Sequence, residues 1–444
     1  MPTFTVSYTT EAEKRAFERA IAFVAEMHAL GLSAPDGSVL DACEALTLSK
    51  GRDFLRETLA GGRSGQDRRR RKKVKVEAPC GHRTRSKGRR PRSVVTAVGK
   101  IALARDYRLC CVCNDAGFPA DAALGLDGSV TRRALRMICH VGASNAFDRG
   151  ERTLRELTGW SIDAETVRRF CHAEAAKCRE NEAERREVAE KFAKAAGDRE
   201  VQIDAGKVNT DTGWRDVKVV SFAVRPPGPP STSEDYEQRD LPKPLVRRVS
   251  AAIETAEDFG RRCRAEAERL ELTDAMNLTV LGDGAEWIWN LAAERFPKAD
   301  QNLDVYHATE YLTDLARAGF GGDGSAVKGW SKSAQKRLVA DGWAGVCEFV
   351  HASGGTVKDR AAFEAAYPKA ANYLAGHRDR MKYAARLRQG KSIGSGMIEG
   401  TIKQMLGRRL KQTGARWKTK HVAPFVELVA FDSGPEWESY WTAA

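Results

Sequence analysis

Apolar residues recur at helical spacing near the start of the chain and in several later stretches. Residues 8–60 have apolar positions three and four apart, with acids near the start of the pattern, and this predicts helices. The same spacing predicts further helices over 130–200, 245–270, 285–296, most of 308–390 and, led by a glycine, 395–412.

Alternating apolar and polar positions predict strands in the remaining stretches. Residues 94–105 alternate, and 200–224 contain two runs rich in β-branched residues, VQIDAGKV and WRDVKVVSFAV. A shorter strand is predicted over 277–283, and LDVYH at 303–307 is interpreted as the end of one more strand. Strands and helices in this order predict a mixed α/β fold rather than repeated βαβ units. The order is compatible with a ribonuclease-H-like core, in which acids at strand ends meet on one side of the sheet.

Composition narrows the class of protein. The chain has 444 residues, of which 42% are hydrophobic and 30% charged, as expected of a folded chain with several domains. No apolar run approaches the roughly 18 residues of a membrane span, and the start, MPTFTVSYTTEAEKR, does not resemble a secretory signal. We therefore expect a cytoplasmic protein with no membrane contact. Its ten cysteines are expected to be reduced unless they bind metal.

The net positive charge of the chain comes from one segment. The net charge is +13, and residues 63–108 alone hold 17 Lys and Arg against three acids, so this segment contains the whole excess. It includes the unbroken run Arg68, Arg69, Arg70, Arg71, Lys72 and Lys73. Such a block favours a polyanion, and nucleic acid is the usual one in a cytosol. The alternative interpretation is a solvated basic linker.

Three carboxylates lie in predicted strands or at a helix start, where a metal site of a mixed sheet is expected. Asp204 lies inside the first strand run, Asp283 ends the isolated strand LTVLGD, and Glu399 begins the helix GSGMIEGTIKQ. Two strand-end aspartates and one helix glutamate can meet and hold divalent cations for phosphodiester chemistry. Acids near strand ends are common in a chain with 60 of them, so only their sequence context makes this hypothesis specific.

That context resembles a known family. The stretch GDGAEWIWNLAAERFPKADQNLDVYHATEYL is similar to the second-aspartate region of DDE-type insertion-sequence transposases, including an Asp-x-x-His motif at Asp304 and His307. GKSIGSGMIEGTIKQMLGRRLKQTGARW resembles the glutamate motif of their Kra-type group, which is related to Mutator-like transposases. DAGKVNTDTGWRDVKV resembles the first-aspartate strand, with Ala205 where the family more often has Gly. The resemblance extends weakly upstream to about residue 90.

The resemblance implies a function and a set of site residues. Asp204, Asp283 and Glu399 become a triad that binds two Mg²⁺ ions, for which Mn²⁺ can substitute, and His307 lies near the scissile phosphate. The implied protein is a bacterial transposase that acts on its element's terminal inverted repeats and target DNA, as a homodimer or higher oligomer on paired ends. The implied parts are an N-terminal helical region (1–62), a basic arm (63–128), a helix-turn-helix-like region (129–198), the first part of the core (199–307), a helical insertion (308–390) and the end of the core (391–444).

Cysteine and histidine spacing predicts a candidate zinc site in the basic segment. Cys110 and Cys113 form a Cys-x-x-Cys pair after a predicted strand, and Cys80 and His82 lie thirty residues upstream. Tetrahedral zinc accepts both ligand types, which is typical of a zinc ribbon. Cys-x-His is one residue shorter than the usual pair, so the upstream half departs from that pattern.

Other DNA contacts are expected from two helices. Residues 146–175 have a helix-turn-helix pattern with Arg168 and Arg169 on the second helix, although an ordinary helical hairpin gives the same pattern. Arg408 and Arg409, in the glutamate motif, are also expected to contact DNA. Trp289, near Asp283, is interpreted as core, with stacking on a flipped base as the alternative.

Two further function classes remain open at the level of sequence. One is a DNA-binding repressor or domesticated relative without catalysis, and the other is a ribonuclease-H-like nuclease that cleaves without joining. A dinucleotide site is not expected, because the G-x-G-x-x-G match at 319–324 follows a helix rather than a strand. No nucleotide cofactor is therefore predicted.

Overall fold

A computed structural model describes residues 5–8, 11–33, 37–60, 82–118, 121, 124–180, 182–273, 275, 277–353, 355–434 and 436–442. It shows a mixed α/β chain with two five-stranded sheets among these residues. The chain forms two compact units, Met1–Ala173 with Trp441–Ala444, and Glu174–Tyr440. The predicted region 129–198 is therefore divided between the two units.

The first unit begins with a helical hairpin followed by a small sheet. The hairpin consists of α1 (Glu11–Ser33), α2 (Val39–Leu46), the π-helical turn η1 (Thr47–Gly51) and helical residues 52–60. The sheet has the order β3-β2-β1-β5-β4, from β1 (Thr84–Thr96), β2 (Gly99–Cys110), β3 (Ala116–Gly117), β4 (Leu126–Asp127) and β5 (Val130–Thr131). Helices α5 (Arg132–Ser144), α6 (Phe147–Thr158) and the first part of α7 (Ala164–Glu180) follow.

The strand prediction over 94–105 was wrong in one respect. This stretch crosses from β1 into β2, which pair as an antiparallel hairpin. Gly99 has a φ of 111° at the turn, a conformation that glycine adopts without strain. The alternation extends through the turn, so the pattern alone does not show where the chain reverses.

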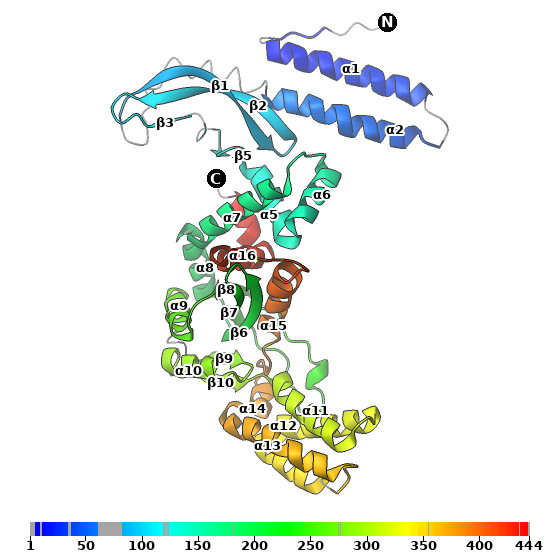
Figure 1. Ribbon diagram of the computed structural model, residues 1–444, viewed down its shortest axis with the longest axis vertical. Helices are drawn as coiled ribbons and strands as arrows, with labels where there is room; N and C mark the ends of the chain where they lie inside the picture. The colour runs from blue at the N-terminus through cyan, green and yellow to red at the C-terminus, as the bar shows by residue number, and fades with distance from the viewer. Residues whose placement is uncertain are drawn as a thin grey trace. The chain divides into compact units, whose positions relative to one another are not determined.

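The second unit contains a sheet in the order β10-β9-β6-β7-β8 (Figure 1). Strands β6 (Asp198–Thr210), β7 (Gly213–Arg225) and β8 (Val246–Ala252) form an antiparallel meander, and β9 (Leu278–Gly282) and β10 (Asp300–Leu303) continue the sheet parallel to β6. The predicted helix over 245–270 is thus a strand followed by helix α9 (Ala256–Arg269).

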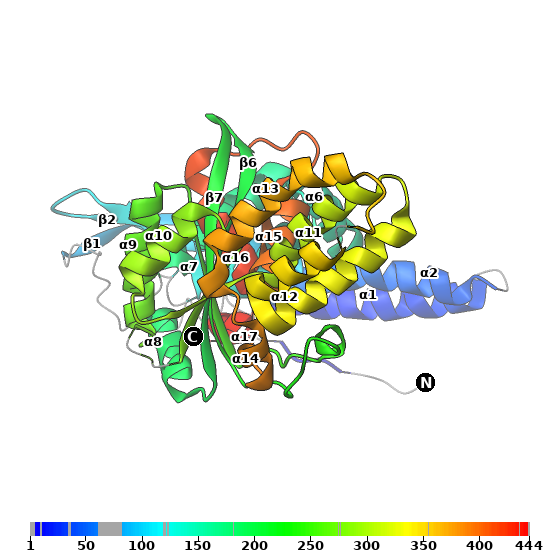
Figure 2. The same ribbon diagram turned by 90° about the horizontal axis from the view of Figure 1, so that it is seen from below.

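Helices cover both faces of this sheet. Buried side chains of β6 and β7 pack with those of α8 (Glu182–Lys194), α9 and α10 (Glu286–Arg295) on one face. The other face contacts α15 (Gly396–Ile402) and α16 (Thr419–Asp432). The remaining elements are η2 (Tyr236–Gln238), α11 (Val305–Phe320), α12 (Gly324–Ser353), α13 (Arg360–Gly376), η3 (Arg378–Arg380), α14 (Tyr383–Arg388), the π-helix η4 (Lys403–Leu410) and α17 (Glu436–Thr442). Figure 2 shows α11, α12 and α13 side by side, which agrees with their contacts.

Candidate functional site

The register of the large sheet aligns three aspartates at one level. Strands β6 and β9 pair in parallel up to Gln202 and Leu281, so two further residues place Asp204 beside Asp283. Strands β9 and β10 pair up to Gly282 and Leu303, so the next position places Asp283 beside Asp304. Neighbouring strands thus bring the three aspartates to one level across the sheet, where β9 and β10 end.

The face of β6 that contains Asp204 is the face covered by α15. Two residues before it, Gln202 accepts a hydrogen bond through Oε1 from the Ile398 backbone N–H, at 3.1 Å. Two residues after it, a Cβ on Gly206 would lie 2.6 Å from Leu406 Cδ1, so this glycine permits the close approach of the helical segment. Side chains two apart share a strand face, and Asp204 therefore faces the segment that contains Glu399.

Asp204 lies close enough to Asp283, Glu399 and His307 to interact with all three electrostatically. Burial, together with the nearby carboxylates of Asp283 and Glu399, raises the pKa of Asp204 to about 6. The Ala205 backbone N–H, 2.6 Å from Asp204 Oδ1, and the nearby His307 act in the opposite direction. Like charges are thus held together in a partly desolvated place, which is a common property of functional sites.

In each carboxylate of the predicted triad, one oxygen accepts a hydrogen bond from the protein. Ala205 N–H donates to Asp204, Ala285 N–H donates to Asp283 Oδ1 at 2.9 Å, and Ser395 Oγ donates to Glu399 Oε1 at 3.2 Å. Within the described part of the chain, the second oxygen of each accepts no hydrogen bond. Carboxylate oxygens are the ligands that a hard divalent cation prefers, so the chemistry of these three donors fits Mg²⁺.

A second arrangement of metal-binding atoms overlaps this site. Ligand atoms of Asp304, His307 and Glu399 all lie within 4.8 Å of one another. Among the described residues, no such close group contains Asp204 or Asp283. Glu399 therefore belongs to both the predicted triad and the Asp304 cluster.

Asp304 has the contacts of a structural residue. It is fully buried, and its Oδ1 accepts the His307 backbone N–H at 2.8 Å as the N-cap of α11. Its Oδ2 accepts hydrogen bonds from both the backbone N–H and the Oγ of Ser395, the latter at 2.9 Å. Both oxygens are thus engaged, and the residue joins the start of α11 to the segment before α15. Ser395 Oγ shares its single proton between Asp304 Oδ2 and Glu399 Oε1, so Asp304 helps to orient that glutamate.

A buried polar network beneath the site was not predicted from the sequence. Glu200, 2% exposed, accepts hydrogen bonds from Arg225 Nε at 3.1 Å, from Gln202 Nε2 at 3.0 Å and from Ser392 Oγ. Gln202 in turn holds the start of α15. This network connects the strand of Asp204 to the helix of Glu399, and alternate polar positions in β6 were its only sequence signal.

Tyr373, in the helical stretch 308–390, contacts Asp283, and Trp289 lies nearby in sequence. Tyr373 Oη donates to the Asp283 backbone oxygen at 2.6 Å and stacks on Tyr311 with 3.8 Å between ring centroids. Trp289 is 3% exposed, with the Arg380 guanidinium 4.6 Å from its ring centroid. Trp289 is therefore a core residue, and its burial argues against stacking on a flipped base.

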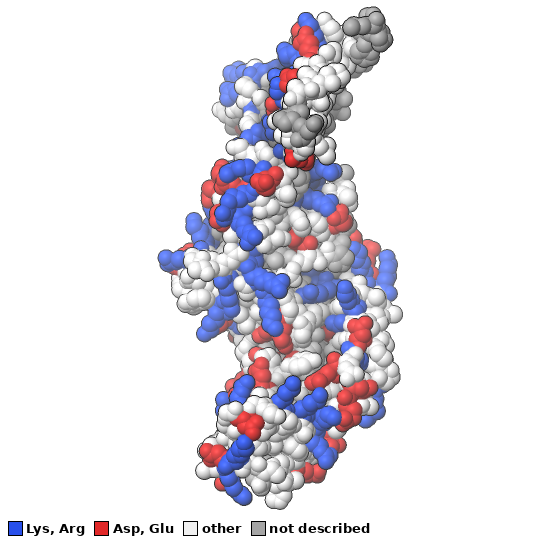
Figure 3. Space-filling model, turned by 90° about the vertical axis from the view of Figure 1, so that its right-hand side faces the viewer, with Lys and Arg blue, Asp and Glu red and all other residues white. Residues whose placement is uncertain are grey.

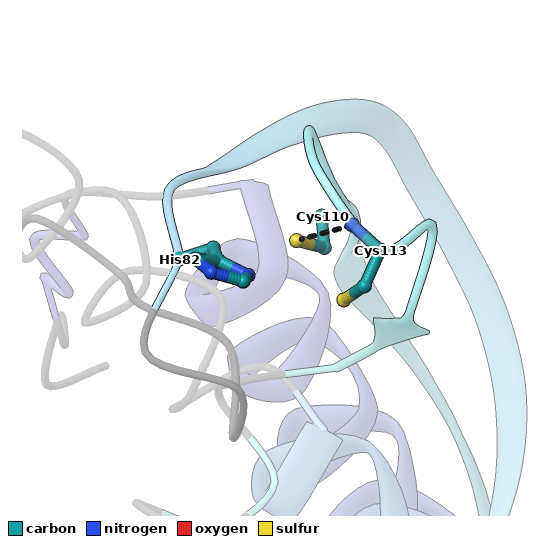
Figure 4. Close-up of side chains that lie close together, drawn as sticks. All are labelled: His82, Cys110 and Cys113. Carbon is teal, nitrogen blue, oxygen red and sulfur yellow. Dashed lines mark hydrogen bonds between the residues drawn. The ribbon is translucent and has the colours of Figure 1, made fainter.

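The predicted cysteine and histidine ligands also meet. His82, Cys110 and Cys113 have ligand atoms within 4.8 Å of one another (Figure 4). The hairpin register explains this, because Thr84 at the start of β1 pairs with Cys110 at the end of β2. The backbone N–H groups of Val112 and Cys113 point at Cys110 Sγ, at 3.4 and 3.5 Å. Cys80 lies outside the described residues.

The residues expected to bind DNA lie in several parts of the chain, and their contacts and exposure differ. The run from Arg68 to Lys73 lies outside the described residues. Helices α6 and α7 follow the predicted pattern, with Gly159 left-handed (φ 65°) at the end of α6 and Asp163 Oδ1 accepting the Thr166 N–H at 2.8 Å. Arg168 donates to Glu165 at 2.7 Å, whereas Arg169 is exposed.

The two arginines of the glutamate motif differ in exposure. Arg408 is exposed, but Arg409 is 4% exposed, with its guanidinium 4.7 Å from the Phe425 ring centroid. The burial of Arg409 argues against the predicted DNA contact and assigns it to the core under α16. Both basic and acidic side chains occur on the face shown in Figure 3, and basic ones are the more frequent across its middle.

Comparison of the chain with protein-family models and with curated proteins finds no match. Among the helices in the described ranges, none combines the length and apolar content that crossing a bilayer requires.

Proposed function

We propose that this protein is a DDE-type transposase of a bacterial insertion sequence, with a ribonuclease-H-like catalytic core. The observation that carries the proposal is the alignment of Asp204 and Asp283 on adjacent strands beneath the segment that contains Glu399. An antiparallel meander extended by parallel strands, with acids at their ends, supports the core assignment. The motif resemblance supports the choice of a transposase over other phosphodiester enzymes.

In this proposal Asp204, Asp283 and Glu399 hold two Mg²⁺ ions, or Mn²⁺ in their place, through the oxygens that accept no protein hydrogen bond. Bound there, the cations supply activation of the attacking oxygen and stabilisation of the leaving oxygen. Water attacks the phosphodiester at the element end, and the liberated 3′-hydroxyl then attacks target DNA. His307, beside Asp204, positions the scissile phosphate.

The remaining chain orients these groups and holds the DNA. Ser395 and Gln202 fix Glu399 relative to β6 through contacts to its carboxylate and its helix. The basic arm binds phosphates without sequence preference, and α6 and α7 set the register on the element ends. We also propose a zinc ion on Cys110, Cys113, His82 and Cys80, since the ligand atoms of the first three lie within 4.8 Å of one another. The protein would act in the cytoplasm, as a dimer or higher oligomer on paired ends.

A strand-transfer assay tests the proposal. The chain is incubated with Mg²⁺, DNA from both flanks of its coding sequence and a supercoiled target. We expect nicking at element ends and joined products, both abolished by EDTA. Nicking without joining would indicate a nuclease, and binding without nicking would indicate a repressor or domesticated relative.

Two variants decide which strand provides the second aspartate. Asp283→Asn should abolish cleavage, because it removes one metal-binding oxygen. Stability should change little, because asparagine can still accept the Ala285 N–H through its one side-chain oxygen. Asp304→Asn should destabilise the second unit by about 1–3 kcal/mol, because its amide group then faces the Ser395 donors. Normal cleavage by Asp283→Asn, measured beside a well-folded but inactive Asp304→Asn, would contradict the assignment.

A further inference from the structure

Strand β8 is an edge strand of the large sheet, and side chains already cap one end of its free edge. Within the described ranges, β7 is the only strand that pairs with it. Near its C-terminal end, the Ala251 N–H donates to Glu427 Oε1 at 3.0 Å, and Ala251 O accepts a hydrogen bond from Arg179 at 3.4 Å. Arg179 Nε and Glu427 Oε2 lie 3.6 Å apart. These two side chains therefore satisfy the backbone of Ala251 in place of a neighbouring strand.

Two earlier residues of β8 have the same backbone direction but no such cap. The N–H and C=O groups of successive strand residues alternate between the two neighbouring sides. Arg247 and Val249 therefore direct these groups to the same side as Ala251. In the part of the chain that the structure describes, no hydrogen bond to another segment engages these four outward groups. An open strand edge of this kind is a template, about 7 Å long from Arg247 to Val249, for a further strand.

A groove of about 360 Å³ follows this open edge. Its walls come from both helix layers that flank the sheet, with Val188 of α8 on one side and Met405 and Phe431 of η4 and α16 on the other. Val188 and Met405 are buried, whereas Leu245, which also lines the groove, is 57% exposed. Apolar walls beside unpaired peptide groups are the arrangement that binds an extended peptide by strand addition.

The charged side chains of the groove are mostly basic. They are Arg179, Lys243, Arg247, Arg248 and Glu427. Arg179 and Arg248 pair with carboxylates. Arg247 instead donates to the hydroxyls of Ser221 and Thr401, and the exposed Lys243 forms no ion pair with any described residue. Two uncompensated positive charges at the groove favour an acidic ligand.

We propose that this edge binds an extended segment of a partner protein in which apolar and acidic residues alternate. The segment pairs with Arg247 and Val249 as an additional strand beside β8. Its apolar side chains contact the groove walls, and its acidic side chains pair with the basic residues, Lys243 above all. The proposal does not depend on the catalytic one, because the groove contains no residue of the predicted triad.

Charge and backbone chemistry argue against other occupants. Pairing of this edge with the same edge of a second copy would bring like basic residues together, and the chain's own basic segment 63–108 would be repelled in the same way. A nucleic acid strand has phosphates for the basic residues, but its backbone lacks the alternating N–H and C=O groups that pair with a strand edge.

Fluorescence anisotropy with the full chain, without DNA, tests the proposal. The probe is a fluorescein-labelled hexapeptide in which valine and glutamate alternate. We expect a Kd of about 10 µM, weakened at least tenfold by Lys243→Glu and unchanged by Lys332→Glu, the matched control at an exposed residue of α12. Val249→Pro should weaken binding as much, because proline removes the outward N–H and leaves the donors to β7 in place. Circular dichroism and thermal unfolding report whether each variant is folded.

Two modified peptides separate strand pairing from attraction between charges. N-methylation of alternate residues removes the amide donors of one edge of the peptide, so one of the two possible patterns should abolish binding and the other should not. In hydrogen-exchange mass spectrometry, the unmodified peptide should slow the exchange of residues 243–250. A wild type that does not bind the peptide would overturn the proposal. Equal binding of both methylated peptides, or binding undiminished in a folded Lys243→Glu variant, would overturn it as well.

Two further results would assign the groove to another occupant and also overturn the proposal. One is an oligothymidylate that displaces the peptide and protects residues 243–250 with equal or higher affinity. The other is protection of these residues at rising concentrations of the chain alone, which would indicate a second copy. A wild type that binds the peptide but neither nicks nor joins DNA would refute the transposase proposal and leave this one intact.

Discussion

Asp204→Asn should stabilise the metal-free protein at neutral pH while removing catalysis. The ordinary pKa of an aspartate is 3.8, and burial, with the nearby Asp283 and Glu399, raises that of Asp204 to about 6. A raised carboxyl pKa means that the folded state holds the proton more tightly than the unfolded state. Stability is therefore lost as pH rises from 3.8 to about 6, by about 3 kcal/mol in total. Asparagine keeps the side-chain shape and the oxygen that accepts the Ala205 N–H but has no charge.

Thermal unfolding in EDTA measures this effect. Near pH 7.5 the Asp204→Asn variant should gain about 3 kcal/mol, on the order of 5–10 °C in Tm, and near pH 5 about half of that. Mg²⁺ should raise the Tm of the wild type and not that of the variant. At a Mg²⁺ concentration 100-fold above its Kd, the wild type should gain about 2.7 kcal/mol of stability. Asp314→Asn, at an exposed residue of α11, is the control with one charge removed elsewhere. A destabilised variant at both pH values would refute the reasoning, because Asp204 would then be a structural hydrogen-bonding group.

Three further outcomes are expected. Gly206→Val should destabilise the second unit by about 1–3 kcal/mol in urea unfolding, since the added side chain collides with Leu406, and an unchanged midpoint would show that the helical segment moves aside. Cys113→Ser should remove the single zinc found by elemental analysis and Cys111→Ser should not, whereas equal zinc contents would exclude Cys113 as a ligand. Replacing residues 68–71 by alanine should flatten the salt dependence of DNA binding by about one log–log unit per lost phosphate contact, and an unchanged slope would indicate a solvated linker.

The strands that carry the site could be predicted because their signals are local. Asp204 lies inside one strand run and Asp283 ends another, and parallel pairing then fixes them at one level. The edge strand β8 could not be predicted in this way. Its sequence, VRRVSAA, has two adjacent arginines and two alanines, and its strand character comes from pairing with β7. One of those arginines, Arg247, extends to Ser221 Oγ at 3.0 Å, a contact between strands that no local pattern contains.

The roles of the polar residues around the triad depend on contacts between distant segments. Asp304 ends a short apolar run as Asp283 does, so sequence alone does not separate a cap from a ligand. The difference is the contact with Ser395, 91 residues away. Gln202 likewise gains its role from Ile398, 196 residues away. Local sequence does not predict the burial of a side chain either. Arg408 and Arg409 are adjacent in sequence, yet Arg408 is exposed and Arg409 lies in the core.

The most direct test of the central claim is strand transfer by single triad variants. Asp204→Asn, Asp283→Asn and Glu399→Gln each remove one charge with little change of shape. Each should abolish both nicking and joining of element-end DNA in Mg²⁺ while binding that DNA with wild-type affinity, and Asp314→Asn should remain active. Undiminished cleavage and joining by any of the three would contradict the proposed site.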